Sequence, residues 1–138
     1  MTYGPDRWTL MKLCREADVP RGVARAAVRR KLIAADGYQR ADVPVLKLAA
    51  VLLDTSRPDG DGEDVVTRNR NAVALIRGLA DDPTPTHHQV MVLTPDSAML
   101  CSDQNAVADA LRRANGDAVT CVPVGRWVDE VFDFMLTA

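Results

Sequence analysis

The chain has 138 residues, of which 47% are hydrophobic and 26% charged, and its formal net charge is −2. This composition is close to the globular average and excludes a disordered chain. No apolar run reaches the roughly 18–20 residues of a membrane span, and Met1–Arg7 has no apolar signal segment, so we expect a soluble cytoplasmic protein without a membrane partner.

The first helix is expected directly after Trp8. Thr9 is a suitable N-cap, because its hydroxyl can accept a hydrogen bond from an amide of the first turn. Asp18-Val19-Pro20 ends the helix and turns the chain. Apolar residues at i, i+3, i+4 and i+7 form one stripe, made of Leu10, Leu13, Cys14 and Ala17.

Two further helices complete the first segment. The second is predicted from about Arg21 to Leu32, with Val23, Ala27 and Val28 facing inward. Asp36-Gly37 is a tight-turn signal. Asp42 then caps a third, strongly apolar helix that continues to about Leu53.

The middle of the chain reads as a linker with one helix. Residues 55–64 (TSRPDGDGED) and 80–86 (ADDPTPT) are rich in Gly, Pro, Asp and Thr, which favour loops. Between them, residues 65–79 have the pattern of a helix.

The last segment changes from a helical to a strand period. Two short strands at 89–93 and 98–101 flank a Thr-Pro-Asp-Ser turn and suggest a hairpin. A helix capped by Ser102 or Asp103 follows and stops at Asn115-Gly116. A third strand at 118–124 and a closing helix at 127–136 complete a ββαβα unit.

The predicted fold class is therefore α+β. We expect residues 1–54 to form a three-helix head, residues 55–86 a linker with a connecting helix, and residues 87–138 a small ββαβα domain.

Charge divides the chain into a basic front and an acidic back. Residues 1–53 hold ten Lys or Arg against five acids, a net +5, whereas residues 54–138 hold seven against fourteen, a net −7. This asymmetry predicts that one face meets phosphate while the rest is repelled by it.

Residues 8–33, WTLMKLCREADVPRGVARAAVRRKLI, align without a gap to the DNA-binding head of MerR-type regulators, Y-T-I-x-E-L-A-x-x-A-G-V-S-x-x-T-L-R-Y-Y-E-R-x-G-L-L. The later Gly37-Tyr38 and Asp42-Val43 are similar to that family's wing motif, G-Y-R followed by D-V. The first third of the chain thus resembles the winged helix-turn-helix heads of the MerR/excisionase family. Equal or similar residues are Trp8, Thr9, Leu10, Leu13, Arg15, Ala17, Val19, Arg25, Arg29, Leu32 and Ile33.

The chain departs from this pattern at several positions. Ala26 and Ala27 replace the family's paired tyrosines, Asp18 its turn glycine and Lys31 its helix-ending glycine. The stretch 33–42 is too short for a full two-stranded wing, which is closer to excisionases than to metal- or drug-sensing regulators.

The resemblance implies double-stranded DNA as the partner, with the second helix in the major groove. Arg21, Arg25 and Arg29 stand four apart and so share one face of that helix. Arg25 matches the family's phosphate-contacting arginine. The DNA-binding residues expected from pattern and resemblance together are Arg21, Arg25, Arg29, Arg30, Lys31 and Arg40.

The resulting prediction is a sequence-specific DNA-binding protein, either a transcriptional regulator or a recombination accessory factor. The alternative is a protein-interaction module whose helix-turn-helix fold has lost DNA binding and whose acidic back half contacts a basic partner. The arginine row alone is also compatible with an ordinary solvated helix face.

The back half is the candidate for joining two copies into a homodimer, since one small head reads few base pairs. An exposed edge of strand 89–93 or 118–124 offers one surface, and the closing helix offers another. A segment of about 50 residues leaves little volume for a small-molecule effector, so none is expected. The proposed dimerisation residues are Trp127, Val131, Phe134 and Met135, for which closing the local core is the alternative role.

No enzyme, metal site or cofactor is predicted. The three cysteines, Cys14, Cys101 and Cys121, are far apart and form no Cys-x-x-Cys pair, so free thiols are expected. His87-His88 has no acidic or Cys partner at ligand spacing, and Ser97 and Ser102 have no nearby His to act as a base.

Overall fold

The computed structural model describes residues 7–55, 63–81, 88–114 and 116–137, without the side chains of residues 64 and 132–137. In this part of the chain, six helices accompany one three-stranded antiparallel sheet, which confirms the α+β class. The helices are α1 (Leu10–Ala17), α2 (Arg21–Arg29), α3 (Asp42–Asp54), α4 (Glu63–Ala80), α5 (Gln104–Ala114) and α6 (Val124–Thr137). The strands are β1 (Val90–Leu93), β2 (Ala98–Cys101) and β3 (Thr120–Val122).

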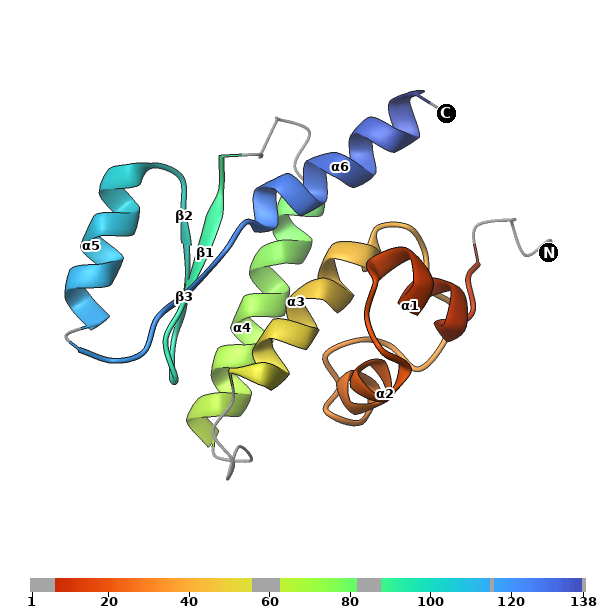
Figure 1. Cartoon of the computed structure of the whole chain (residues 1–138), viewed down its shortest axis with the longest axis horizontal. Helices are drawn as coiled ribbons and strands as arrows, with labels where there is room; N and C mark the ends of the chain where they lie inside the picture. Colours follow the sequence, from red (N-terminus) through yellow and green to blue (C-terminus); the bar gives the residue numbers. More distant parts are fainter. Residues whose placement is uncertain (1–6, 56–62, 82–87, 115, 138) are drawn as a thin grey trace.

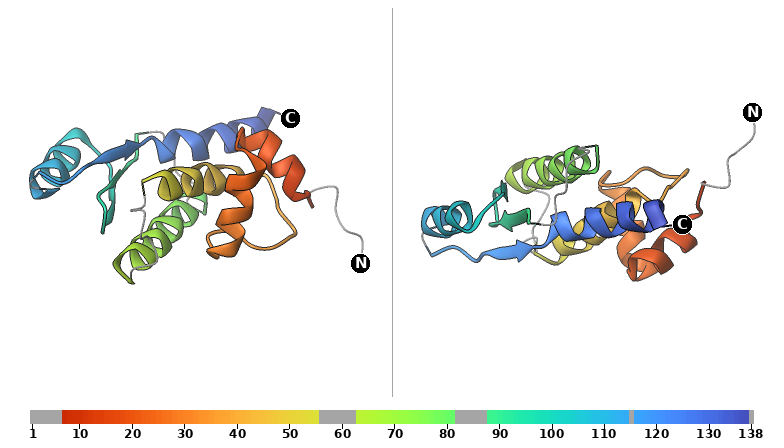
Figure 2. Two further views of the ribbon diagram at one scale, coloured as in Figure 1. Left: turned by 60° about the horizontal axis from the view of Figure 1, so that its bottom comes forward. Right: turned by 90° about the horizontal axis from the view of Figure 1, so that it is seen from above.

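The elements are stacked in layers along the long axis of the molecule. From left to right in Figure 1 these are α5, the sheet, the pair α4 and α3, and finally α1 with α2. Helix α6 runs along α3 and returns the C-terminal part of the chain toward α1 (Figure 2). The first and last segments of the sequence are thereby brought together.

Helix α1 forms as its sequence predicts. The Thr9 hydroxyl accepts a hydrogen bond from the Lys12 amide at 3.2 Å, and Leu13, Cys14 and Ala17 are buried. The helix ends where Asp18 adopts a left-handed conformation with φ 55°, and the Val19 amide donates to the Cys14 carbonyl at 3.0 Å. This is the Schellman arrangement, which satisfies carbonyls of the last turn.

Helix α2 is shorter than expected and ends at Arg29 instead of Leu32. Lys31 adopts φ 61°, and the Leu32 amide bonds back to the Ala27 carbonyl at 2.9 Å, which closes a second Schellman arrangement. The fully buried face consists of Ala24 and Ala27, whereas Val23 and Val28 are only half-buried. Small residues on that face let α2 lie close to α1 and α3.

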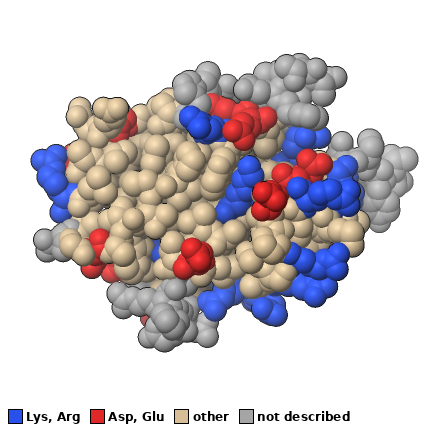
Figure 3. All heavy atoms as spheres, viewed as in Figure 1, with Lys and Arg blue, Asp and Glu red and all other residues tan. Residues whose placement is uncertain are grey.

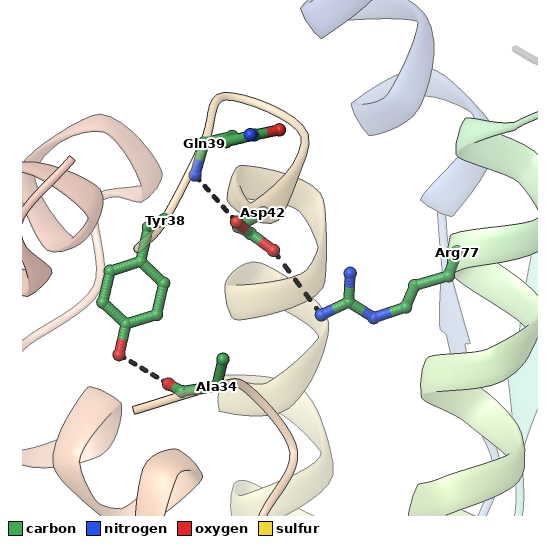
Figure 4. Close-up of polar contacts among 5 residues, drawn as sticks. All are labelled: Ala34, Tyr38, Gln39, Asp42 and Arg77. Carbon is green, nitrogen blue, oxygen red and sulfur yellow. Dashed lines mark hydrogen bonds and ion pairs between the residues drawn. The ribbon is translucent and has the colours of Figure 1, made fainter. Parts of the chain in front are cut away.

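The segment between α2 and α3 contains no hairpin, although all its residues are described. Its β-type pairing is a single bridge from Tyr38 to Trp8, with amide-to-carbonyl distances of 2.7 and 3.3 Å. The Tyr38 hydroxyl donates to the Ala34 carbonyl at 2.6 Å, and the Asp42 carboxylate accepts from the Gln39 amide at 2.8 Å (Figure 4). Side-chain hydrogen bonds thus hold this loop, in agreement with the expectation that the stretch 33–42 is too short for a full two-stranded wing.

Helix α4 is a core element and more than a connection. It presents Ala72, Ile76 and Leu79 to α3 and α6, and Arg68 is buried on the same side with 1% of its surface exposed. Arg77 reaches back to Asp42 at 3.5 Å, which joins α4 to the first turn of α3 (Figure 4). The flanking stretches 56–62 and 82–87, where the sequence predicts loops, lie outside the described residues.

The sheet has the order β2-β1-β3, so β1 is its central strand. Met91 and Leu93 face the main core, and Val92 faces a smaller cluster with Cys101 and Ala110 of α5. Because both faces are covered, β1 is apolar throughout. The prediction of an exposed strand edge is wrong for 89–93, because both edges of β1 are paired. The outer strands are β2 and β3.

Local signals place the remaining elements to within a few residues. Asp103 caps α5, accepting from the Ala106 amide at 2.7 Å. Strand β3 spans only 120–122 of the predicted 118–124, and α6 begins at Val124, three residues earlier than expected.

One hydrophobic cluster extends from Trp8 through α3 and α4 to Val131 on α6. Residues from all three segments expected from the sequence contribute to this cluster. No helix in the described ranges is long and apolar enough to cross a membrane.

Candidate nucleic-acid interface

Helix α2 carries a row of exposed arginines on the face opposite its buried alanines. Arg21, Arg25 and Arg29 are all exposed, and they follow one another at intervals of about one turn. The helix has 9 residues and starts after Pro20, which has no side-chain group that can cap its first amides. The exposed start of α2 thus combines unshared amide donors with two arginines, which favours anions there.

Arg29 also belongs to a second group of cations at the other end of α2. Arg29, Arg30 and Lys31 line a hollow of about 340 Å³ together with Arg70 from α4. Leu32, Val66 and Val73 supply its apolar part, and Asn69 is also in the lining. Helix α4 therefore contributes Arg70, a cation outside the predicted DNA-binding set, and three further lining residues.

Two of the predicted DNA-binding residues have conformations or contacts that the sequence did not indicate. Lys31 is held in the left-handed region at φ 61°. Arg40 is half-buried, with its guanidinium carbon 5.3 Å from the centre of the Trp8 ring. The Lys12 ammonium also lies over this ring, at 4.8 Å. Trp8, 7% exposed, is thus a core residue that orders two cations.

The surface charge shows the basic part of the division seen in the sequence. In Figure 3 many Lys and Arg atoms lie on the right and at the bottom, over α1 and α2, with acidic groups among them, and a further basic group lies at the left end, over α5. The surface over the sheet is mostly uncharged in this view.

The four proposed dimerisation residues do not form one described surface. Val131 is 9% exposed and packs in the core of its own chain. Trp127 is half-buried against that core, with the Lys47 ammonium 5.6 Å from its ring centre. The side chains of Phe134 and Met135 lie outside the described residues. The packing of Trp127 and Val131 corresponds to the alternative role, closing the local core.

Other chemistry-bearing groups are scattered. In the described ranges no three His, Cys, Asp or Glu side chains are grouped to hold a metal ion. His88 is exposed, and His87 falls outside the described residues. Cys14 and Cys101 are buried and Cys121 is exposed, all as free thiols. Burial is the main cause that raises the pKa of the Cys101 thiol, which disfavours a reactive thiolate.

Comparison of the chain with protein-family models, curated proteins and solved structures gives no match.

Proposed function

We propose that this protein binds double-stranded DNA sequence-specifically through α2, as a transcriptional regulator or recombination accessory factor. The single observation that carries the proposal is the exposed row Arg21, Arg25 and Arg29 on a short helix whose other face is buried. Two short helices joined by a three-residue turn and supported by a third are compatible with a helix-turn-helix head.

The distribution of cations supports a phosphate-facing surface. Arg30 and Lys31 continue the arginine row beyond α2, and no arginine of the row has a buried side chain. Arginines near the helix start would meet base edges, and those near its end would meet backbone phosphates. The acidic segment 54–138 is repelled by the duplex, which orients the head toward it.

We further propose that the protein acts as a homodimer on two half-sites. One helix reads only a few base pairs, and a second linked head raises the effective concentration for the second contact into the millimolar range. Because Val131 belongs to the core, the outer strand β3 is the better candidate for the contact between copies.

Fluorescence anisotropy with labelled duplex DNA tests the role of α2. Replacing Arg25 and Arg29 together by Ala should weaken binding by about 2–4 kcal/mol, at ~1–2 kcal/mol per contact. The matched control replaces the exposed Arg113 and Arg126 on α5 and α6, changes the net charge equally and should leave binding nearly unchanged. Equal losses in both variants would favour the alternative, a protein-interaction module without specific DNA binding.

A further inference from the structure

The hollow between the end of α2 and α4 gathers like charges from two elements that are distant in sequence. Arg29 ends α2 and Lys31 follows it, whereas Arg70 lies on α4. Arg30 completes a set of four cations around a space of about 340 Å³. None of the described residues that line it is acidic. An anion that enters this space is attracted by the positive charges around it.

One of these cations is held at a conformational cost. Lys31 has φ 61°, a left-handed conformation that is strained for a residue with a Cβ and where glycine is the usual choice. Glycine at this position would close the same Schellman arrangement with less strain. The chain carries a lysine here instead, and Lys31 is one of the residues that line the hollow.

Three of the four remaining lining residues are apolar, and the fourth is Asn69. Leu32 is buried, and Val73 is half-buried. Val66 is 43% exposed, and it is one of the few exposed large apolar side chains among the described residues. Apolar side chains next to convergent charges are typical of sites for small molecules, and 340 Å³ lies within the usual size range of such sites.

We infer that this hollow is a binding site for a small organic phosphate, a phosphomonoester on an apolar body. A phosphomonoester carries about −1.5 to −2 charge near neutral pH and three acceptor oxygens, which suits four cations better than a single carboxylate does. The apolar body would cover Val66 and Val73. Since Arg29 also belongs to the row on α2, the bound ligand competes with DNA for this arginine.

Competition with DNA depends on the proposed function, but binding of the phosphate does not. It is measured on the full chain without DNA, by calorimetry and by amide chemical shifts, with phenyl phosphate as the probe. Inorganic phosphate supplies the charge alone, and benzoate supplies the ring with a single negative charge. Phenyl phosphate should bind about tenfold more tightly than inorganic phosphate, because its ring removes apolar surface from water. It should also bind more tightly than benzoate, and the amides of Val66 and Val73 should shift.

Two substitutions with the same charge change locate the site. Arg70→Gln should weaken phenyl phosphate binding about five- to tenfold, because it removes a charged hydrogen-bond donor. The thermal melt of this variant should match that of the parent protein. Arg126→Gln, on α6 and outside the lining, should leave binding unchanged. Equal affinity for inorganic and phenyl phosphate, or equal weakening by both substitutions, would overturn the assignment and indicate non-specific attraction of anions. A protein that binds phenyl phosphate but no DNA would keep this site and lose the proposed function.

Discussion

Arg68 on α4 donates a hydrogen bond from Nη2 to the backbone carbonyl of Leu52, 3.0 Å away near the end of α3. The carbonyls of a last helical turn have no partner inside their helix. The same guanidinium donates from Nη1 to the Thr94 carbonyl at 3.1 Å, just after β1. One buried side chain thus joins α3, α4 and the sheet, and burial lowers the pKa of its guanidinium.

Arg68→Met should lower the free energy of unfolding by about 2–4 kcal/mol, because two buried carbonyls lose a charged donor. Arg68→Lys should recover only part of this loss, since one ammonium group cannot copy the guanidinium geometry. Urea unfolding measures both. The control Arg70→Gln, two residues away and exposed, should change stability by no more than about 0.5 kcal/mol. A similar loss in both positions would contradict the joining role.

The left-handed residues Asp18 and Lys31 make a matched pair for testing backbone strain. Lys31→Gly should be more stable than Lys31→Ala by about 1 kcal/mol, because only glycine relieves the strain at φ 61°. Asp18→Gly should likewise be more stable than Asp18→Ala, because Asp18 has φ 55°. Thermal melts give the stabilities. Only the substitutions of Lys31 should weaken binding of phosphate or DNA. If the substitutions of Asp18 weaken binding equally, the effect comes from the changed backbone at a helix end and not from the charge of Lys31.

Stability should fall in alkali because of Tyr38. Burial, followed by the nearby Asp36 and Asp42 carboxylates, raises the pKa of this phenol above its ordinary value of 10.0. Tyr38 therefore ionises at lower pH in the unfolded chain than in the folded one. Its contribution to the free energy of unfolding is complete below about pH 10 and is lost as the pH rises through the pKa of the folded state. Tyr38→Phe should cost about 1 kcal/mol near neutrality through the lost bond to Ala34 and should reduce the alkaline loss. An unchanged alkaline profile in this variant would assign that loss to other groups.

Light scattering at tens of micromolar should give twice the 15.0 kDa mass of one chain. Because Val131 is buried in its own chain, Val131→Ala should lower the unfolding free energy by about 1–2 kcal/mol and leave the dimer intact. If the Val131→Ala dimer dissociates while the variant is as stable as the parent protein, Val131 belongs to the contact between copies. A monomeric parent protein would remove the dimer from the proposal.

The parts of the fold that were predictable from the sequence depend on local signals. Thr9, the 3.6-residue apolar stripe of α1, the hairpin turn after β1 and the cap Asp103 each act within a few residues. Asp18 and Lys31 are instructive, because both have positive φ and stand where the MerR-type sequence pattern has glycine. A left-handed backbone occurs at both positions, although neither carries glycine, the residue that best suits it.

Features that depend on distant contacts were not predictable. Arg68 follows the buried Val65 by three residues and precedes the buried Ala72 by four, a spacing that places it on the buried face of α4. The charge of its side chain obscured this spacing signal, because an arginine is ordinarily expected at the surface. The cation supplied by Arg70 is 39 residues from Lys31 in the sequence, and only the packing of α4 beside α2 brings them to one hollow. The central position of β1 likewise follows from the return of β3.

The central claim is most directly tested by titrating labelled random-sequence duplex DNA with the full chain at several salt concentrations between about 50 and 200 mM. If four to six cations of α2 and its neighbourhood meet phosphates, the logarithm of the association constant should fall with the logarithm of salt with a slope of about −4 to −5. Arg25→Ala with Arg29→Ala should reduce the magnitude of this slope by about 2. No binding at the lowest salt, or a slope that the double substitution leaves unchanged, would contradict a DNA-binding role for α2.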